Sequence, residues 1–240
     1  MMGIYWRDIL LPLELEVSDF YILRLNSQGD VTWSKTYGGT QPECANSVKP
    51  TSDGGFIVVG FVNENGNGNV YVLKLRENGE KEWDLIYGKS GDDRAFDVVE
   101  VEAGKYVVCG YSDSKESGDY DIYLLEVLEN GNIAWERKIG GNNNDKAYSI
   151  VKTGDGGFIL AGETSQESFK DVYVVKVDSN GIKEWDKKYG GPSNDEARCI
   201  KTTPDGGYIV AGATASFGPS AYNFYVLKLD KDGNTGANPQ

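Results

Sequence analysis

Four acidic residues recur at one position of this sequence, about 50 residues apart. Each stands two residues before an alanine that begins a short apolar run, and the four are Glu43, Asp93, Asp145 and Asp195. Carboxylate oxygens are ligands that Ca²⁺ prefers, so these acids could form a calcium site, although no DxDxDG-type loop is present. Repetition in every unit favours the alternative that they accept hydrogen bonds from loop N–H groups. We therefore expect no cofactor, with Ca²⁺ as the alternative.

The residue directly after each of these alanines differs between units, as Asn46, Phe96, Tyr148 and Arg198. A structural position should keep its residue type through a repeat, whereas a binding position need not. We therefore predict that these four residues line a ligand pocket that faces a central channel. Aromatic rings can stack on sugars, and the less regular aromatic residues near the same rim are further candidates: Tyr120, Phe169, Phe217 and Tyr222.

The absence of histidine excludes whole classes of catalysis. Ser-His-Asp and Cys-His sites cannot form, and neither can zinc sites with histidine ligands. Hydrolysis would have to rest on carboxylates, as in the carboxylate pair of a glycosidase. Asp92 and Asp97 are unique to one unit and Asp119 and Asp121 lie in a neighbouring loop, so these four are the candidates for such a site.

Charge and hydrophobicity exclude further functions. Acidic residues outnumber basic ones by 37 to 24, which gives a net charge of −13. Such a chain is poorly suited to nucleic-acid phosphates or anionic membranes. No stretch of 18 apolar residues is present, so we expect no membrane insertion. The apolar run at residues 9–13 is too short for a secretory signal and is followed by Glu14 and Glu16.

These residues belong to a repeat with a period near 50 residues. A tryptophan followed four residues later by Tyr-Gly-Gly or a close variant marks each unit, at Trp33, Trp83, Trp135 and Trp185. A fixed period of this length is typical of repeat architectures. The three cysteines, Cys44, Cys109 and Cys199, are too few and too scattered for a disulfide framework, and we expect them to be packing residues.

Each unit predicts four strands. The second unit shows the pattern: an alanine strand at residues 45–48, an Asp-Gly-Gly turn, a continuous apolar strand at 56–60, and a loop of about ten residues. An alternating strand follows at 70–75, then an Asn-Gly hairpin and a charged strand that carries the tryptophan. Continuous apolar runs indicate strands buried on both faces, and Asn-Gly between alternating runs predicts a hairpin. A unit with a small inner strand, apolar middle strands and a charged outer strand is a β-propeller blade.

The combined pattern AxSVxxTxDGGFIVxGxT … DxYVLKLDxxGxxxWxKxYGG resembles the propeller repeats of many bacterial and archaeal secreted or surface proteins. These repeats are distantly similar to those of quinoprotein-type propellers, but no cofactor-contacting motif matches. The resemblance covers residues 19–233 and implies a propeller fold and an extracellular or cell-surface setting.

The repeats can be counted in two ways. We predict one all-β domain, residues 1–240, with five blades at 1–37, 45–87, 95–139, 147–189 and 197–233. In this arrangement residues 3–17 form degenerate inner strands and the last blade lacks its outer strand. The alternative has four blades, with the N-terminal tryptophan strand closing the last one. A fragment of a larger propeller, or closure by a second chain, is also compatible with the count.

The sequence therefore favours a non-catalytic binding or interaction module. We expect its partner to be a glycan or another protein, bound at the rim loops and channel mouth. The alternatives are a carboxylate-based carbohydrate-active enzyme and a structural spacer in a surface assembly. An unclosed blade edge could also lead to oligomers.

Overall fold

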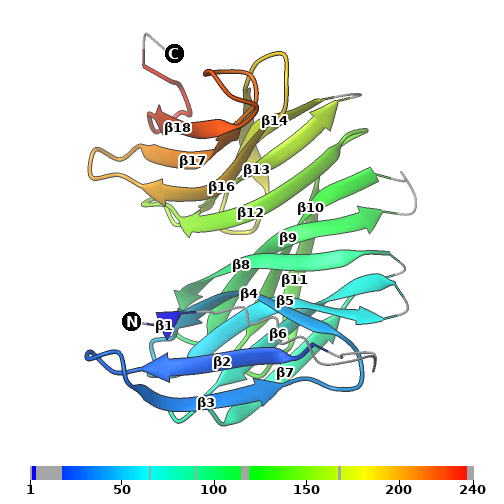
Figure 1. The fold of residues 1–240 in the computed structure, drawn as a ribbon, viewed down its shortest axis with the longest axis vertical. Helices are drawn as coiled ribbons and strands as arrows, with labels where there is room; N and C mark the ends of the chain where they lie inside the picture. The colour runs from blue at the N-terminus through cyan, green and yellow to red at the C-terminus, as the bar shows by residue number, and fades with distance from the viewer. Residues whose placement is uncertain are drawn as a thin grey trace.

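The computed structural model describes residues 2–3, 18–64, 66–89, 91–114, 119–166 and 169–236. Within them, eighteen β-strands form five antiparallel sheets, which follow one another along the molecule (Figure 1). The predicted all-β fold with four-stranded propeller blades is confirmed. The described residues include no helix with the length and apolar character needed to cross a membrane.

The three middle sheets have four strands each, hydrogen-bonded in chain order. The second sheet comprises β4 (Glu43–Pro50), β5 (Phe56–Glu64), β6 (Asn67–Leu75) and β7 (Lys81–Tyr87). The third comprises β8 (Asp93–Glu102), β9 (Lys105–Ser114), β10 (Asp119–Leu128) and β11 (Ile133–Ile139). The fourth comprises β12 (Asn144–Lys152), β13 (Phe158–Gln166), β14 (Phe169–Val177) and β15 (Lys183–Tyr189).

The two end sheets have three strands each. The first comprises β1 (Met2–Gly3), β2 (Phe20–Leu25) and β3 (Val31–Tyr37), and the fifth comprises β16 (Asp195–Thr202), β17 (Tyr208–Thr214) and β18 (Asn223–Leu229). β1 pairs with β2, where a second strand of the blade belongs, and residues 4–17 of the predicted inner strands lie outside the described residues. β3 pairs with β2, so the N-terminal tryptophan strand belongs to the first sheet and not to the last. In the fifth sheet, Thr235 bridges Leu229 where an outer strand would begin.

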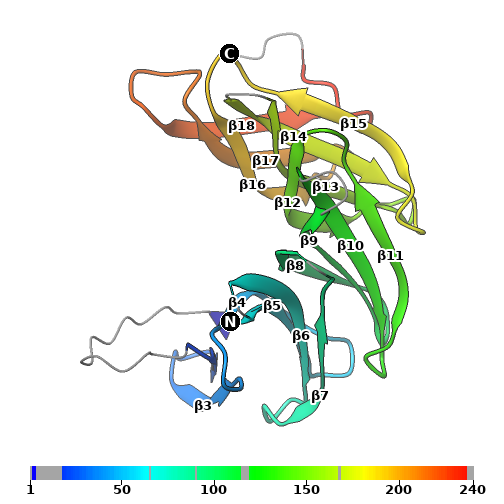
Figure 2. The same cartoon turned by 90° about the vertical axis from the view of Figure 1, so that its right-hand side faces the viewer.

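The sheets form a C-shaped arc (Figure 2). The first and fifth sheets lie at its opposite ends in both views. The inner strands β4, β8, β12 and β16 contact one another in turn and lie on the concave side. The outer strands β7, β11 and β15 lie on the convex side. The alanine strands therefore line a shared concave surface, as expected for strands that face a channel.

The core lies between successive sheets. We call the face that a sheet turns to the next sheet its leading face, and the opposite one its trailing face. Between the fourth and fifth sheets, Ile159, Val172 and Val174 of the leading face pack with Val210 and Leu227 of the trailing face. Because each middle sheet is covered on both faces, its central strands are apolar at nearly every position.

Each outer-strand tryptophan packs on the hairpin turn of the following sheet. Gly79, at φ +77°, lies under Trp33, and a Cβ atom at Gly79 would come within 3.0 Å of the indole ring. Trp33 Nε1 also donates to the Glu77 carbonyl oxygen at 3.1 Å. The same packing recurs for Trp83 on Gly131, Trp135 on Gly181 and Trp185 on Gly233. The tryptophans therefore join neighbouring blades.

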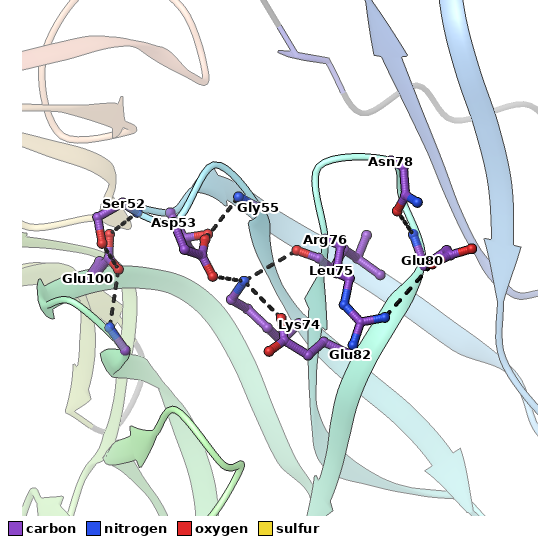
Figure 3. A network of polar contacts seen from close by, with 12 residues as sticks. Ser52, Asp53, Gly55, Lys74, Leu75, Arg76, Asn78, Glu80, Glu82 and Glu100 are labelled. Carbon is purple, nitrogen blue, oxygen red and sulfur yellow. Dashed lines mark hydrogen bonds and ion pairs between the residues drawn. The ribbon is translucent and has the colours of Figure 1, made fainter.

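A buried lysine ties the first turn of a sheet to its third strand (Figure 3). Lys74 Nζ lies 2.7 Å from Asp53 Oδ2, 3.3 Å from the Leu75 carbonyl oxygen and 3.5 Å from Glu82 Oε2. Lys176 with Asp155 and Lys228 with Asp205 repeat the pair. The third sheet has Glu126 at the lysine position and no aspartate in its turn, so both partners are missing there together.

Candidate ligand-binding site

A β-bulge interrupts each of the four described inner strands, β4, β8, β12 and β16, directly after its alanine. In the second sheet, Ala45 pairs with Gly60 and Ser47 with Val59, which leaves Asn46 without a partner on β5. The third, fourth and fifth sheets have the same shift, and the unpaired residues are Phe96, Tyr148 and Arg198. A bulge redirects the side chain of its extra residue. The four predicted ligand-binding residues are thus the four bulge residues of the arc.

A glycine opposite each bulge makes this geometry possible. A Cβ atom at Gly110 would lie 1.8 Å from the Arg94 carbonyl oxygen, far inside van der Waals contact. The same close approach occurs at Gly60, Gly162 and Gly212. Only glycine allows the two backbones to come this near. The glycine that ends each apolar run in the sequence is therefore required by the bulge.

The bulge residues form a continuous row across the concave side. Asn46 Nδ2 donates to the Ala95 carbonyl oxygen of the next inner strand at 2.7 Å. The rings of Phe96 and Tyr148 meet edge to face with centroids 5.0 Å apart. The Arg198 guanidinium lies 4.7 Å from the Tyr148 ring centroid. The structure thus brings together Asn46, Phe96, Tyr148 and Arg198, which we call the inner-strand row.

A second group of aromatic residues extends the row toward β9 and β10. Tyr111 contacts Phe96 at 5.5 Å and Tyr120 at 5.0 Å between ring centroids. Lys146 Nζ lies 4.4 Å from the Tyr111 ring and 4.2 Å from the Tyr120 ring. Cations at these distances from aromatic faces are held by cation–π attraction. The result is a surface that offers both aromatic faces and a cation.

Charges around the row are partly neutralised. Arg198 pairs with Glu196 at 2.7 Å, and Arg94 pairs with Asp92 at 2.8 Å. Burial lowers the pKa of Lys146. Burial raises the pKa of the Tyr148 phenol, and the negative charge of Glu163 raises it further. Tyr148 is therefore a neutral hydrogen-bonding group at physiological pH.

The four acids of the predicted metal ring lie buried at the opening of each inner strand. Glu43, Asp93 and Asp195 accept hydrogen bonds from the backbone N–H groups of Gly39, Lys89 and Gly191 at 2.9, 2.8 and 2.8 Å. Asp145 occupies the same place in the fourth sheet, with Oδ2 3.0 Å from a Cβ atom built on Gly140. These contacts are those of loop-capping carboxylates. Among the described residues, no three Cys, Asp or Glu side chains cluster closely enough to hold a metal ion.

A second carboxyl or amide group faces each buried acid across the Tyr-Gly-Gly turn. In the fourth-to-fifth connection, a Cβ atom at Gly190 would lie 2.4 Å from Asp171 Oδ1 and 2.6 Å from Asp195 Oδ2. Burial raises the pKa of Asp171, and the charge of Asp195 raises it further. In the second sheet an amide replaces the first carboxyl group, so that Asn69 faces Asp93 across Gly88. Two carboxylates therefore face each other across Gly190, whereas at Gly88 the amide of Asn69 removes this charge repulsion.

Two of the four candidate catalytic carboxylates, Asp97 and Asp92, accept hydrogen bonds. Asp97 is buried and accepts hydrogen bonds from Ser47 Oγ at 2.9 Å and Ser149 Oγ at 3.3 Å. It also forms an ion pair with Lys49 Nζ at 3.0 Å. It thereby connects the inner strands of three sheets. Asp92 accepts the Gly68 N–H at 2.9 Å as well as Arg94. Asp119 and Asp121 lie on β10, and Asp121 stands beside Gly140 in the turn described above.

The remaining aromatic candidates divide into two groups. Tyr120 joins the row through Tyr111 and Lys146. Phe169 is exposed at the start of β14, and Phe217 and Tyr222 are exposed between β17 and β18. No aromatic contact joins these three to the row. Sequence reasoning missed Lys146 and Tyr111, although both break the repeat. Lys146 stands where other units have Cys44, Arg94 and Glu196, and Tyr111 stands where they have Phe61, Glu163 and Ala213.

An open cleft of about 820 Å³ lies elsewhere, between the first sheet and the hairpin turn of the second. Its walls are already bonded to each other, because Arg24 pairs with Glu77 at 3.1 Å and Trp33 donates to the Glu77 backbone. The aromatic residues of the inner-strand row are partly exposed and come from positions that vary between sheets, and we therefore regard the row as the candidate site.

No known protein-family model matches the chain, and no curated protein matches it either. Solved structures do resemble it. A protein of unknown function from Bacteroides caccae is 14% identical with a TM-score of 0.51, over 90% of this chain and 67% of that one. Sqt1 from Chaetomium thermophilum is 15% identical with a TM-score of 0.53, over 93% of this chain and 53% of that one.

Puromycin hydrolase is also similar, at 15% identity and a TM-score of 0.54, over 90% of this chain and 34% of that one. The chain thus spans about half of Sqt1 and about a third of puromycin hydrolase. At these identities the likeness shows the propeller-type fold alone.

Proposed function

We propose that this chain is a non-catalytic binding module whose ligand is a glycan held against the inner-strand row. The observation that carries the proposal is the row itself. The bulge is a structural device repeated in four sheets, yet the residue it presents differs each time, as Asn46, Phe96, Tyr148 and Arg198. A position whose backbone is constant and whose side chain varies is a position that the fold leaves free for recognition.

The chemistry of the row suits a sugar. A sugar ring has apolar C–H faces and polar edges, so it needs flat aromatic surface with hydrogen-bonding groups beside it. Phe96 and Tyr148 are half-buried and held in place by each other, which limits the side-chain entropy that binding costs. The Tyr148 hydroxyl and the Arg198 guanidinium, which lies over the Tyr148 ring, supply the polar groups.

The test is a thermal melt of the purified chain against a panel of mono- and oligosaccharides, with Ca²⁺ and a chelator as separate additions. A ligand that binds only the folded chain stabilises it by about 2.7 kcal/mol at a hundred times its dissociation constant. We expect a sugar to raise the midpoint. No shift with any sugar would contradict glycan binding, and a calcium shift reversed by chelator would assign a metal to the buried acids.

Two substitutions locate the site. Tyr148→Ala removes the central ring of the row and should weaken binding about tenfold or more, equivalent to about 1.4 kcal/mol. Tyr148→Phe keeps the ring and should retain most of the affinity. Phe224→Ala removes an exposed ring of similar size at the end of the arc and should leave affinity unchanged. Equal losses in Tyr148→Ala and Phe224→Ala would contradict the assignment.

A further inference from the structure

The leading face of the fifth sheet is an apolar surface that nothing in the described chain covers. Phe224 is 97% exposed and Val226 is 59% exposed, and Ile209 of the neighbouring strand is exposed beside them. Their counterparts on the fourth sheet, Val172 and Val174, are completely buried by the fifth sheet. The fifth sheet thus keeps the side chains of a blade interface, and no described blade packs on them.

The trailing face of the first sheet is the matching half of such an interface. Tyr21 is 45% exposed, whereas the tyrosines at its position in the other four sheets are buried: Tyr71, Tyr123, Tyr173 and Tyr225. The hairpin glycine Gly29 has no neighbour within 4 Å, whereas Gly79 of the second sheet is covered by Trp33 of the first. The first sheet is therefore built to receive a preceding blade.

These two faces are complementary, because a leading face packs on a trailing face at each of the four junctions between the five sheets. At each internal junction, the leading side chains at the positions of Phe224 and Val226 pack with the trailing side chains of the next sheet, at the position of Tyr21 and its neighbours. Phe20 and Ile22 of the first sheet, for example, are buried against Tyr71 and Leu73 of the second. On β18 and β2 the two free faces carry the residue types of the internal junctions in the same registers, while the second strand of the first sheet is the short β1.

One molecule does not bring its own free faces together, since the first and fifth sheets lie at opposite ends of the arc (Figures 1 and 2). We propose that the chain self-associates head to tail, with the leading face of the fifth sheet of one copy packed on the trailing face of the first sheet of a second copy. The contact joins two different surfaces, so it is heterologous and either closes into a ring or continues as a filament. It continues the blade stacking that holds each chain together.

The test measures mass by light scattering after gel filtration, over a wide range of protein concentrations. We expect the wild-type chain to form dimers or larger species whose fraction rises with concentration. Phe224→Asp should weaken the association about thirtyfold, the typical effect of losing a central aromatic contact. Because Phe224 is 97% exposed in the single chain, this change should leave the melting midpoint of the monomer unchanged. Ile182→Asp adds the same charge at an exposed apolar residue in the turn between β14 and β15 of the fourth sheet and should have no effect.

A mixing experiment separates head-to-tail contact from nonspecific adhesion. Tyr21→Asp blocks the trailing face, with Tyr21→Ser as the milder variant if the first does not fold. Each single-face variant should be monomeric alone, while Phe224→Asp mixed with Tyr21→Asp should give a one-to-one dimer and nothing larger, because one intact face of each kind remains. A wild-type chain that stays monomeric, or a mixture that forms no dimer, would overturn the proposal.

Discussion

Replacing Lys74 by methionine tests whether the buried lysine stabilises the blade through its charge. The Lys74 side chain is 3% exposed, and its Nζ atom lies 2.7 Å from Asp53 Oδ2. Burial acts to raise the pKa of Asp53, but its hydrogen bonds to Lys74, Thr51 and Gly55 outweigh burial and lower that pKa from 3.8 to about 2. Methionine keeps the length and apolar packing of the lysine stem but cannot bind the carboxylate.

The expected loss follows from that pKa. Each pKa unit corresponds to about 1.4 kcal/mol, so the full change would be worth about 2.5 kcal/mol. Thr51 and Gly55 supply part of this change and remain in the variant. Because the Asp53 side chain is also 53% exposed, solvent screening leaves about 1 kcal/mol for Lys74. Because the pKa of Asp53 is depressed in the folded chain, this stability is present above about pH 4 and is lost as the pH falls toward about 2.

The assay is urea unfolding followed by tryptophan fluorescence at neutral pH and near pH 2. Lys74→Met should lower the free energy of unfolding by about 1 kcal/mol at neutral pH, and the difference from wild type should disappear near pH 2. Lys81→Met is the control, since Lys81 is half-exposed and pairs with Asp84 on the surface. An equal loss at both pH values would show that Lys74 acts through packing, and the reasoning from charge would be wrong.

Three further changes have defined outcomes. Gly110→Ala should lower the melting midpoint by several degrees, because its Cβ atom would lie 1.8 Å from a backbone oxygen. Gly141→Ala, with open space around it, should be neutral. Equal effects of the two substitutions would contradict the role of glycine opposite the bulge. Asp171→Asn should raise the melting midpoint at neutral pH, because the raised pKa of Asp171 means that its charged form opposes folding. Below about pH 4 the variant and the wild type should melt at the same temperature. A lower midpoint of the variant at neutral pH would contradict the repulsion between Asp171 and Asp195. Asp97→Ala should cost about 3 kcal/mol or more, because the buried Ser149 hydroxyl and Ile150 N–H and the partly exposed Lys49 ammonium lose their acceptor. A loss below about 1 kcal/mol would show that this network is dispensable.

Most of the architecture follows from local sequence. The Asn-Gly and Asp-Gly-Gly turns, the double-sided apolar strands and the tryptophan strand each specify one part of a blade, and their repetition specifies the stack. The open arc could not be predicted, because it depends on small rotations between neighbouring sheets that no single residue determines. The fifth sheet also departs from the expected burial, since Ile209 of its apolar strand is exposed where the equivalent Ile159 is buried.

The candidate site was predictable only in part. The variable position after each alanine identified the row, but the reason for its variability is a one-residue bulge that appears only once the strands are paired. Tyr111 meets Tyr120 through the pairing of β9 with β10, in which Tyr111 lies opposite Ile122, two positions from Tyr120. Lys146 reaches both rings only because β12 packs against β9 and β10 of the preceding sheet. Contacts of this kind depend on how sheets stack, which the sequence pattern of one strand does not contain.

The measurement that most directly tests whether the inner-strand row binds a glycan is calorimetric titration of an oligosaccharide panel into the wild-type chain and into Tyr148→Ala. We predict saturable binding of at least one oligosaccharide to the wild type, weakened about tenfold or more in Tyr148→Ala and unchanged in Phe224→Ala. Binding that is equally strong in the wild type and in Tyr148→Ala, or no binding of any sugar to the wild type, would contradict the assignment of the row as a glycan site.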